Sequence, residues 1–253
     1  MKEIIRAENL TKRYSSVVAL DNVSFSTHEK EIIGLVGDNG AGKSTLLNIL
    51  VGLIQPDEGK LFLNGREVKF KSPGDARDEG VEIVYQSGNM VEGLNVYKNF
   101  FMGREIIKNG MLDKATMRKK SEEAMEEIGI SKSSNSLVEE LSGGQRQAVS
   151  LGRAFYFGKS VLLLDEPTTG LSLKEVDNTL DRVKVIREKA NMSIIFVTHN
   201  LQHIMPIADR IIVLYHGEKI CDKKTKHTDI DEISKMITTR IKEEDHVDET
   251  KYI

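Results

Sequence analysis

The chain has 253 residues, of which 39% are hydrophobic and 30% are charged, a balance that is ordinary for a globular domain with its own core. Its formal net charge of -3 provides no basic excess, so we expect no nucleic-acid partner. The single cysteine, Cys221, excludes a disulfide framework, no apolar run approaches the ~20 residues that cross a bilayer, and the N-terminus does not have the pattern of a signal peptide. If the protein works at a membrane, a partner must supply the membrane-spanning part.

The first part of the chain predicts β-strands. Short apolar segments separated by turns lie at residues 2–10, 19–27 and 31–37. Helical periodicity begins at Ser44, directly after a glycine-rich loop. A hairpin with Asn64-Gly65 at its turn is then predicted, because this dipeptide favours the tight turn that joins two antiparallel strands.

The rest of the chain predicts helices and strands in alternation. Residues from about 87 to 140 are rich in Met, Lys and Glu at helical spacing, which predicts a helical subdomain. Strands are expected at 81–86, 161–165 and 193–199, helices from 142, at 173–190 and at 200–208, and a closing hairpin at His216-Gly217. This alternation predicts a mostly parallel sheet covered on both faces. We expect one domain over residues 1–240 and a charged tail over residues 241–253 that frays.

The glycine-rich loop matches a phosphate-binding pattern. Gly37, Gly42, Lys43 and Ser44 fit G-x-x-x-x-G-K-[ST] residue for residue. Glycines let backbone N–H groups turn inward to phosphate oxygens, Lys43 can reach the β- and γ-phosphates, and the Ser44 hydroxyl can bind Mg²⁺. The predicted nucleotide contacts are Gly37, Asp38, Asn39, Gly40, Ala41, Gly42, Lys43, Ser44 and Thr45. Alone, this loop indicates only a nucleoside triphosphate, because kinases, GTPases and motor ATPases share it.

Two further motifs narrow the chemistry. In "VLLLDEP" (161–167) an apolar strand ends in two acids, so Asp165 is predicted to hold Mg²⁺ and Glu166 to polarise the attacking water, although an ordinary strand can also end in acids. In "LSGGQRQ" (141–147) Ser142 can cap a helix that begins with exposed backbone N–H groups, which makes a second anion site. One nucleotide needs two such loops only if two chains share it.

The segment 141–147 resembles the signature of the ATP-binding-cassette (ABC) ATPases, and the resemblance runs in the family's order from about Tyr14 to Asp222. It implies an α/β fold: a P-loop NTPase core with a mostly parallel sheet, an antiparallel β subdomain and an inserted α-helical subdomain. It also implies ATP and Mg²⁺ as ligands. Two cassettes would close head to tail around two ATP molecules, with Ser142, Gly143, Gly144 and Gln145 of one chain covering the nucleotide of the other.

The resemblance assigns roles to three more residues. Gln86 would contact Mg²⁺ and the attacking water, His199 would bind the γ-phosphate, and Tyr14 would stack on adenine. Without the resemblance, Tyr14 could equally be core packing, and His199 with His203 has the i, i+4 spacing of a metal pair. The sequence departs from the family at Ser172, where an aspartate that helps to couple the two sites is usual.

Residues 92–105 and the Lys174-Glu175 pair resemble the branch of ATPases that energise importers of simple sugars. This implies transmembrane permease subunits and a second ATPase subunit as partners, an external solute-binding protein as an indirect one, and a place at the cytoplasmic face of the membrane. A groove beside Gln86 would receive a permease helix and would be formed by Met90, Val91, Leu94, Phe100 and Phe101, although such a stripe can also be core. An exporter or lipid-release ATPase, an iron–sulfur assembly cassette and a catalytically dead binding module remain alternatives.

Overall fold

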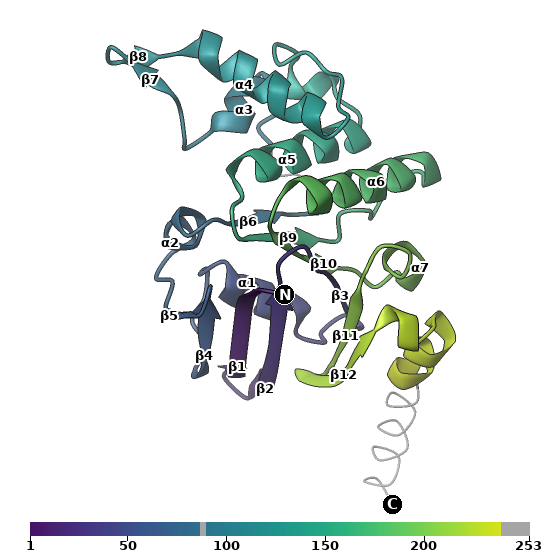
Figure 1. Ribbon diagram of the computed structural model, residues 1–253. Helices are drawn as coiled ribbons and strands as arrows, with labels where there is room; N and C mark the ends of the chain where they lie inside the picture. The colour runs from purple at the N-terminus through teal and green to yellow at the C-terminus, as the bar shows by residue number, and fades with distance from the viewer. Residues whose placement is uncertain (87–89, 239–253) are drawn as a thin grey trace, which may run out of the picture.

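The computed structural model describes residues 1–86 and 90–238, and the predicted tail at 241–253 lies outside these residues. Figure 1 shows a sheet-based body below and a mostly helical lobe above it. In the body, a six-stranded sheet lies beside a smaller antiparallel sheet. Within the described ranges, no helix is long and apolar enough to cross a membrane.

The central sheet has the strand order β12-β11-β3-β10-β9-β6. Its members are β3 (Ile32–Val36), β6 (Val81–Val84), β9 (Val161–Asp165), β10 (Ser193–Val197), β11 (Arg210–Tyr215) and β12 (Glu218–Lys224). Adjacent strands are parallel except β11 and β12, which form the predicted hairpin with His216 and Gly217 at positive φ. The mostly parallel sheet is therefore as predicted.

Alternate residues of the inner strands serve two separate hydrophobic cores. In β3, Ile32 and Val36 face one core, while Ile33 and Leu35 face the other. Both faces of a strand are buried when helices cover a parallel sheet on both sides, which is why β3 and β10 are apolar without alternation. Helix α1 (Lys43–Leu50) belongs to the core of the antiparallel sheet, whereas α5 (Gly143–Phe157) and α6 (Leu173–Lys189) belong to the other core.

The antiparallel sheet has the order β2-β1-β4-β5. Two 12-residue strands, β1 (Glu3–Tyr14) and β2 (Val17–His28), form a long hairpin, and β4 (Glu58–Leu63) pairs with β5 (Arg66–Val68) around the predicted Asn64-Gly65 turn. Asn64 and Gly65 both have positive φ, as the tight hairpin turn requires. The sequence prediction placed shorter strands here, because the polar residues of the exposed face break up the apolar runs.

The lobe above the sheet contains α3 (Val96–Phe101), α4 (Lys114–Glu127), a 3-10 turn (Val138–Glu140) and α5. It also contains a small hairpin, β7 (Ile107–Lys108) with β8 (Met111–Leu112), which the sequence did not predict. Helix α2 (Pro73–Asp78), before β6, was likewise not predicted, although Ser72 caps it and Pro73 begins it. Helix α7 (Leu201–Ile204) is shorter than the predicted 200–208.

Two residues assigned to the permease groove are core residues instead. Phe100 is 0% exposed and Phe101 is 1% exposed, and their rings pack with those of Tyr156 and Phe157. The groove prediction was wrong for both, because helical periodicity marks an apolar face without saying whether a neighbouring helix covers it. Among the other predicted residues, Val91 is exposed and Met90 is partly buried against the core.

Replacing Phe100 with Ala should therefore lower the free energy of unfolding by about 3–5 kcal/mol, because it leaves a cavity among the three remaining aromatic rings of Phe101, Tyr156 and Phe157. Met111→Ala, at a position that is 73% exposed, is the control and should change it by less than about 0.5 kcal/mol. Equilibrium urea denaturation measures both free energies of unfolding. Equally small changes for the two variants would contradict the core position of Phe100.

Candidate nucleotide site

The loop between β3 and α1 has the backbone that the phosphate-binding pattern predicts. Gly37 has φ 151° and Gly42 has φ 100°, both in the region that favours glycine. A Cβ on Gly37 would lie 2.2 Å from the backbone oxygen of Leu214, and one on Gly42 would lie 2.5 Å from that of Ala19. The loop is thus fixed between β11 and β2, while Gly40 faces open space. Glycine is required where the loop touches its neighbours, and the loop is open at Gly40.

Lys43 lies across this loop. Its Nζ donates to the carbonyl oxygens of Gly37 at 2.6 Å and Asp38 at 2.8 Å, and the residue is only 8% exposed. Burial lowers the pKa of Lys43, and the charges of Glu166, Asp38 and Asp165 oppose that shift. The nearby acids therefore favour the ammonium form at the place where the pattern predicts phosphate binding.

Asp165 ends β9, a strand between β10 and β6 whose first four residues are buried. Burial raises the pKa of Asp165, the neighbouring Glu166 raises it further, and Lys43 lowers it. The carboxylate thus lies in a half-buried position where a cation would stabilise its charge. This fits the predicted Mg²⁺ ligand, because Mg²⁺ prefers oxygen ligands and is commonly held by one or two carboxylates.

Glu166 and His199 are in direct contact. Glu166 Oε1 accepts a hydrogen bond from the backbone N–H of His199 at 3.1 Å and lies 2.9 Å from His199 Nδ1. Glu166 Oε2 accepts from Thr169 Oγ1 at 3.0 Å. The side chain of Glu166 is 16% exposed and that of His199 is 59% exposed. Glu166 also has φ 49°, which turns the chain directly after β9.

The metal-pair alternative for His199 and His203 finds no support in the geometry. His203 Nδ1 lies 3.0 Å from Thr168 Oγ1, and its Nε2 lies 3.1 Å from Asn200 Nδ2. His199 is directed to Glu166 instead. Over the described part of the chain, no group of three or more His, Cys, Asp or Glu side chains could hold a metal ion.

Tyr14 and Gln86 make no described hydrogen bond to any of the other predicted site residues. Tyr14 is 46% exposed at the end of β1, with Lys12 Nζ 5.6 Å from its ring centroid, so it is no core residue. Gln86 is exposed just beyond β6, and Val84 of that strand pairs with Leu164, directly before Asp165. Both residues are exposed.

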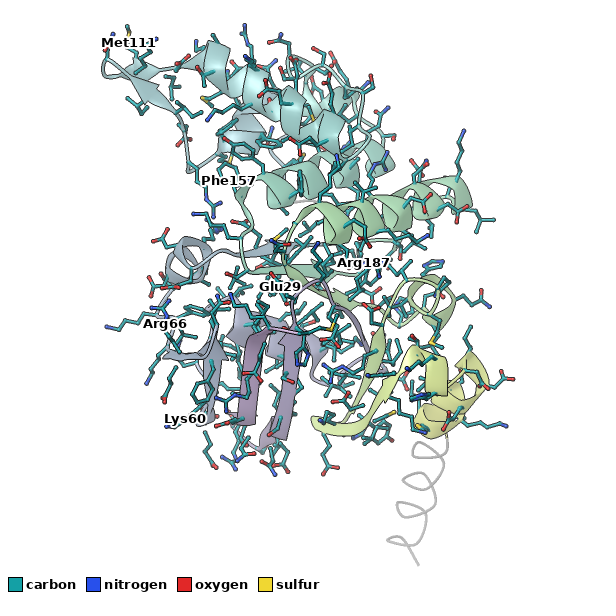
Figure 2. The ribbon with its side chains drawn as sticks, viewed as in Figure 1. Glu29, Lys60, Arg66, Met111, Phe157 and Arg187 are labelled. Carbon is teal, nitrogen blue, oxygen red and sulfur yellow. The ribbon has the colours of Figure 1, made fainter. Side chains whose placement is uncertain are left out.

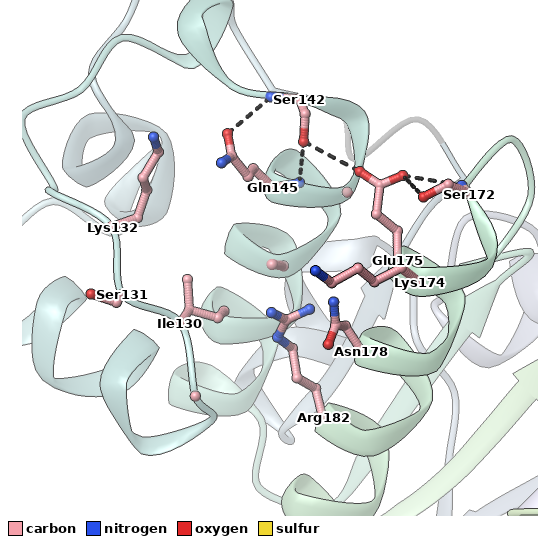
Figure 3. Close-up of a pocket in the computed structure, with 13 residues that line it drawn as sticks. Ile130, Ser131, Lys132, Ser142, Gln145, Ser172, Lys174, Glu175, Asn178 and Arg182 are labelled. Carbon is pink, nitrogen blue, oxygen red and sulfur yellow. Dashed lines mark hydrogen bonds between the residues drawn. The ribbon is translucent and has the colours of Figure 1, made fainter.

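The signature residues form a helix N-terminus at a separate place. Ser142 Oγ accepts from the backbone N–H of Gln145 at 3.2 Å, and Gln145 Oε1 accepts from that of Ser142 at 3.0 Å, which is a capping box at the start of α5. A cleft of about 450 Å³ opens beside it, between α5 and α6, and no residue of the phosphate loop lines this cleft (Figure 3). The two predicted anion sites of the chain therefore do not meet in this cleft.

Sequence reasoning missed two residues at these places. Thr169, bonded to Glu166, carries no signal of its own in the sequence. Glu175, which contacts Ser142 at the start of α5, could have been found as the fourth residue of a Ser-x-x-Glu capping box that begins at Ser172.

The comparison with protein families decides between the nucleotide-binding classes. Residues 20–169 match the family described as ABC transporter, a range that contains the phosphate loop, the signature and both acids. The chain belongs to the ABC transporter family. This assignment agrees with the observed α/β fold and supports the binding of a nucleotide.

Relatives of known description agree with this assignment. The chain is 38% identical to the xylose/arabinose import ATP-binding protein XylG of Sulfolobus acidocaldarius, over 94% of this chain and 95% of that protein. It is 39% identical to the fructose import ATP-binding protein FrcA of Rhizobium meliloti, over 86% of this chain and 87% of that protein. It spans about half of the ribose import ATP-binding protein RbsA 1 of Rubrobacter xylanophilus, with 34% identity over 96% of this chain and 48% of that one.

Solved cassettes have the same fold. A structure of the ADP conformation of an ATP-binding cassette of an ABC transporter superposes with a TM-score of 0.81 at 25% identity and covers 94% of this chain and 96% of its own. The dimeric structure of a bacterial ABC transporter cassette gives a TM-score of 0.75 at 26% identity and covers 88% of this chain and 99% of its own.

Replacing Asp165 with Asn should leave the nucleotide-free protein at least as stable as the original, with a rise in Tm of up to about 3 °C. The reason is that burial and Glu166 both disfavour the ionised Asp165, while Glu166 and Asp38 still face Lys43. Thermal denaturation without nucleotide measures the change, with Asp177→Asn on the exposed face of α6 as the control. A fall of several degrees for Asp165→Asn alone would show that its charge stabilises the empty protein.

Proposed function

We propose that this chain is the ATP-hydrolysing subunit of an importer for a simple sugar. The observation that carries the hydrolytic part is the contact of Glu166 with His199 at the edge of the sheet where Lys43 and Asp165 also lie. The sugar part is supported by the relatives XylG and FrcA, which are named for the import of xylose or arabinose and of fructose and which the chain matches over most of their length. Those names favour an importer over an exporter or a lipid-release system.

The residues of the first site divide the chemistry among themselves. Lys43 and the backbone N–H groups of residues 37–45 would bind the β- and γ-phosphates, with Tyr14 against the adenine. Ser44, Asp165 and Gln86 would hold Mg²⁺, which supplies charge neutralisation of the phosphates. Glu166 would orient and deprotonate the attacking water, and His199 would bind the γ-phosphate from the other side. The residues present fit this ligand set, since acids, a lysine and a curled backbone meet at one edge.

The carboxylate of Glu166 is held by its neighbours in this structure. Both of its carboxylate oxygens accept hydrogen bonds, one from His199 and one from Thr169. If His199 turned to the γ-phosphate, Glu166 Oε1 would lose its side-chain partner and could accept the proton of a water.

The second anion site belongs to the dimer. Ser142, Gly143, Gly144 and Gln145 present a capped helix start that no residue of the same chain's phosphate loop approaches within the cleft. We infer that this surface covers the ATP bound by a second cassette, either another copy or a paralogue. ATP would then hold the pair together, and hydrolysis would open it.

A permease would dock on the lobe, at the cytoplasmic face of the membrane. A cleft of about 360 Å³ lies beside the end of β6. It is lined by Tyr85, Met90 and Met102 together with the charged side chains of Arg77, Glu82 and Arg153. Arg104 pairs with the buried Glu82 at 2.6 Å, which ties β6 to the lobe at this cleft. A helix end inserted here would act on β6 and hence on Gln86. An external solute-binding protein would act only through that permease.

Replacing Glu166 with Gln should trap a dimer in the presence of ATP and Mg²⁺, because binding survives while water activation is lost. Light scattering after size-exclusion chromatography measures the mass, and the hydrolysis rate should fall by at least about 100-fold. The double variant Lys43→Ala/Glu166→Gln is the control and should stay monomeric. A Glu166→Gln chain that remains monomeric with ATP contradicts the shared site.

Lys43→Ala should weaken ATP binding by about 10- to 100-fold, since a charge-assisted contact to the phosphates is lost. Isothermal titration measures the affinity. Lys184→Ala, which removes an exposed lysine paired with Asp181 on α6, should leave it unchanged. Equal affinities for all three proteins would overturn the assignment of the phosphate loop.

A further inference from the structure

Glu175, near the start of α6, bridges two segments that the proposed function places against a second cassette. Glu175 Oε2 accepts hydrogen bonds from Ser172 Oγ at 2.8 Å and from the Ser172 backbone N–H at 3.1 Å. Glu175 Oε1 accepts from Ser142 Oγ at 3.4 Å. Figure 3 shows the carboxylate between Ser142 and Ser172, with these hydrogen bonds drawn as dashed lines.

The carboxylate lies against the first turn of α5. A Cβ on Gly144 would lie only 2.4 Å from Glu175 Oε1, so the side chain fills the space over that glycine. Hydrogen bonds from Ser172 come first among the causes that lower the pKa of Glu175, and the backbone N–H of Gly144 and the hydroxyl of Ser142 add to them. Glu175 is therefore an anion held by the same groups that would cover a γ-phosphate.

We propose, on the basis of the proposed function, that Glu175 competes with the partner cassette's γ-phosphate for the signature motif. Its carboxylate occupies the start of α5 when the two cassettes are apart. It must leave before that γ-phosphate can bind there. Two anions cannot share Ser142 and the Gly144 N–H, because like charges at contact distance repel. Dimer closure then includes a local exchange of one anion for another. Glu175 acts as a positioning residue, and no bond is made or broken.

The cleft beside Glu175 offers a place for the displaced side chain. It is lined by Lys174, Asn178 and Arg182, which lie on the same helix as Glu175 (Figure 3). The Nε of Arg182 is buried and has no hydrogen-bond partner among the described residues. Burial lowers the pKa of Arg182, and no acid is among the causes of that shift. A carboxylate that rotates into the cleft would lie beside the positively charged side chains of Lys174 and Arg182 that line it.

The same contacts explain how the two segments remain aligned. Ser172 begins α6 and Ser142 begins α5, and Glu175 is the side chain that accepts hydrogen bonds from both. Release of Glu175 from Ser142 therefore also changes how Ser172 is held. The signature and the start of α6 would respond to the partner's nucleotide together.

The test is made in the Glu166→Gln chain, with ATP and Mg²⁺ as the probe. Adding Glu175→Gln, which keeps the size but removes the charge, should lower the ATP concentration for half-maximal dimerisation by about fivefold, the effect of one charge at a helix N-terminus. Adding Asp177→Asn removes an equal charge from the exposed face of the same helix and should not shift it. Light scattering across an ATP titration provides the values.

A merely structural role for Glu175 predicts the opposite result. If Glu175 only caps α6 and aligns the interface, Glu175→Gln will need more ATP, and that outcome overturns the proposal, as does an unchanged midpoint. Should Glu175→Gln fail to fold, Glu175→Asp keeps the charge at the start of α6 but is too short to reach Ser142, and it should also lower the midpoint. If the Glu166→Gln parent itself does not dimerise, the proposed function fails instead.

Discussion

The candidate site depends on holding two carboxylates and one lysine close together where the buried strands of the central sheet end. Lys43, Asp165 and Glu166 interact electrostatically where β3 and β9 end, and desolvation acts against the charge of both Lys43 and Asp165. The apolar strands that precede them are buried almost throughout. Mg²⁺ would pair with the carboxylate of Asp165 and a phosphate with Lys43, so the charges at this edge are complementary to those of the proposed ligand.

A similar argument applies to the start of α5. The first N–H groups of a helix have no acceptor within the helix. Here the carboxylate of Glu175 accepts a hydrogen bond from one of them, the backbone N–H of Gly144. The phosphate loop is bridged by Lys43, whose Nζ donates to loop carbonyl oxygens. In the separate chain, both anion sites are thus partly occupied by internal groups. In the proposed function, binding at either site would be an exchange of partners, and the response to ATP would depend on small rearrangements.

Much of the fold could be predicted from the sequence because its signals are local. The Asn64-Gly65 and His216-Gly217 turns, the strand 161–165 and the capping of α5 by Ser142 each follow from a few adjacent residues. The contacts that could not be predicted join distant segments. Phe100 is core only because α5 brings Tyr156 and Phe157 against it, and Glu175 reaches Ser142 only because α5 and α6 pack side by side. The roles of Gln86 and Tyr14 stay predictions, since accessibility alone does not assign them.

The most direct test of the central claim is to recover tagged Glu166→Gln from gently solubilised membranes with ATP and Mg²⁺ and to identify the co-eluting proteins by mass spectrometry. The Lys43→Ala chain, tagged in the same way, distinguishes ATP-dependent capture from background. We expect a protein with many membrane spans to co-elute, together with a different second cassette if the ATPase dimer consists of two different chains. Recovery of soluble proteins alone would contradict a role in transport while leaving the ATP site in place.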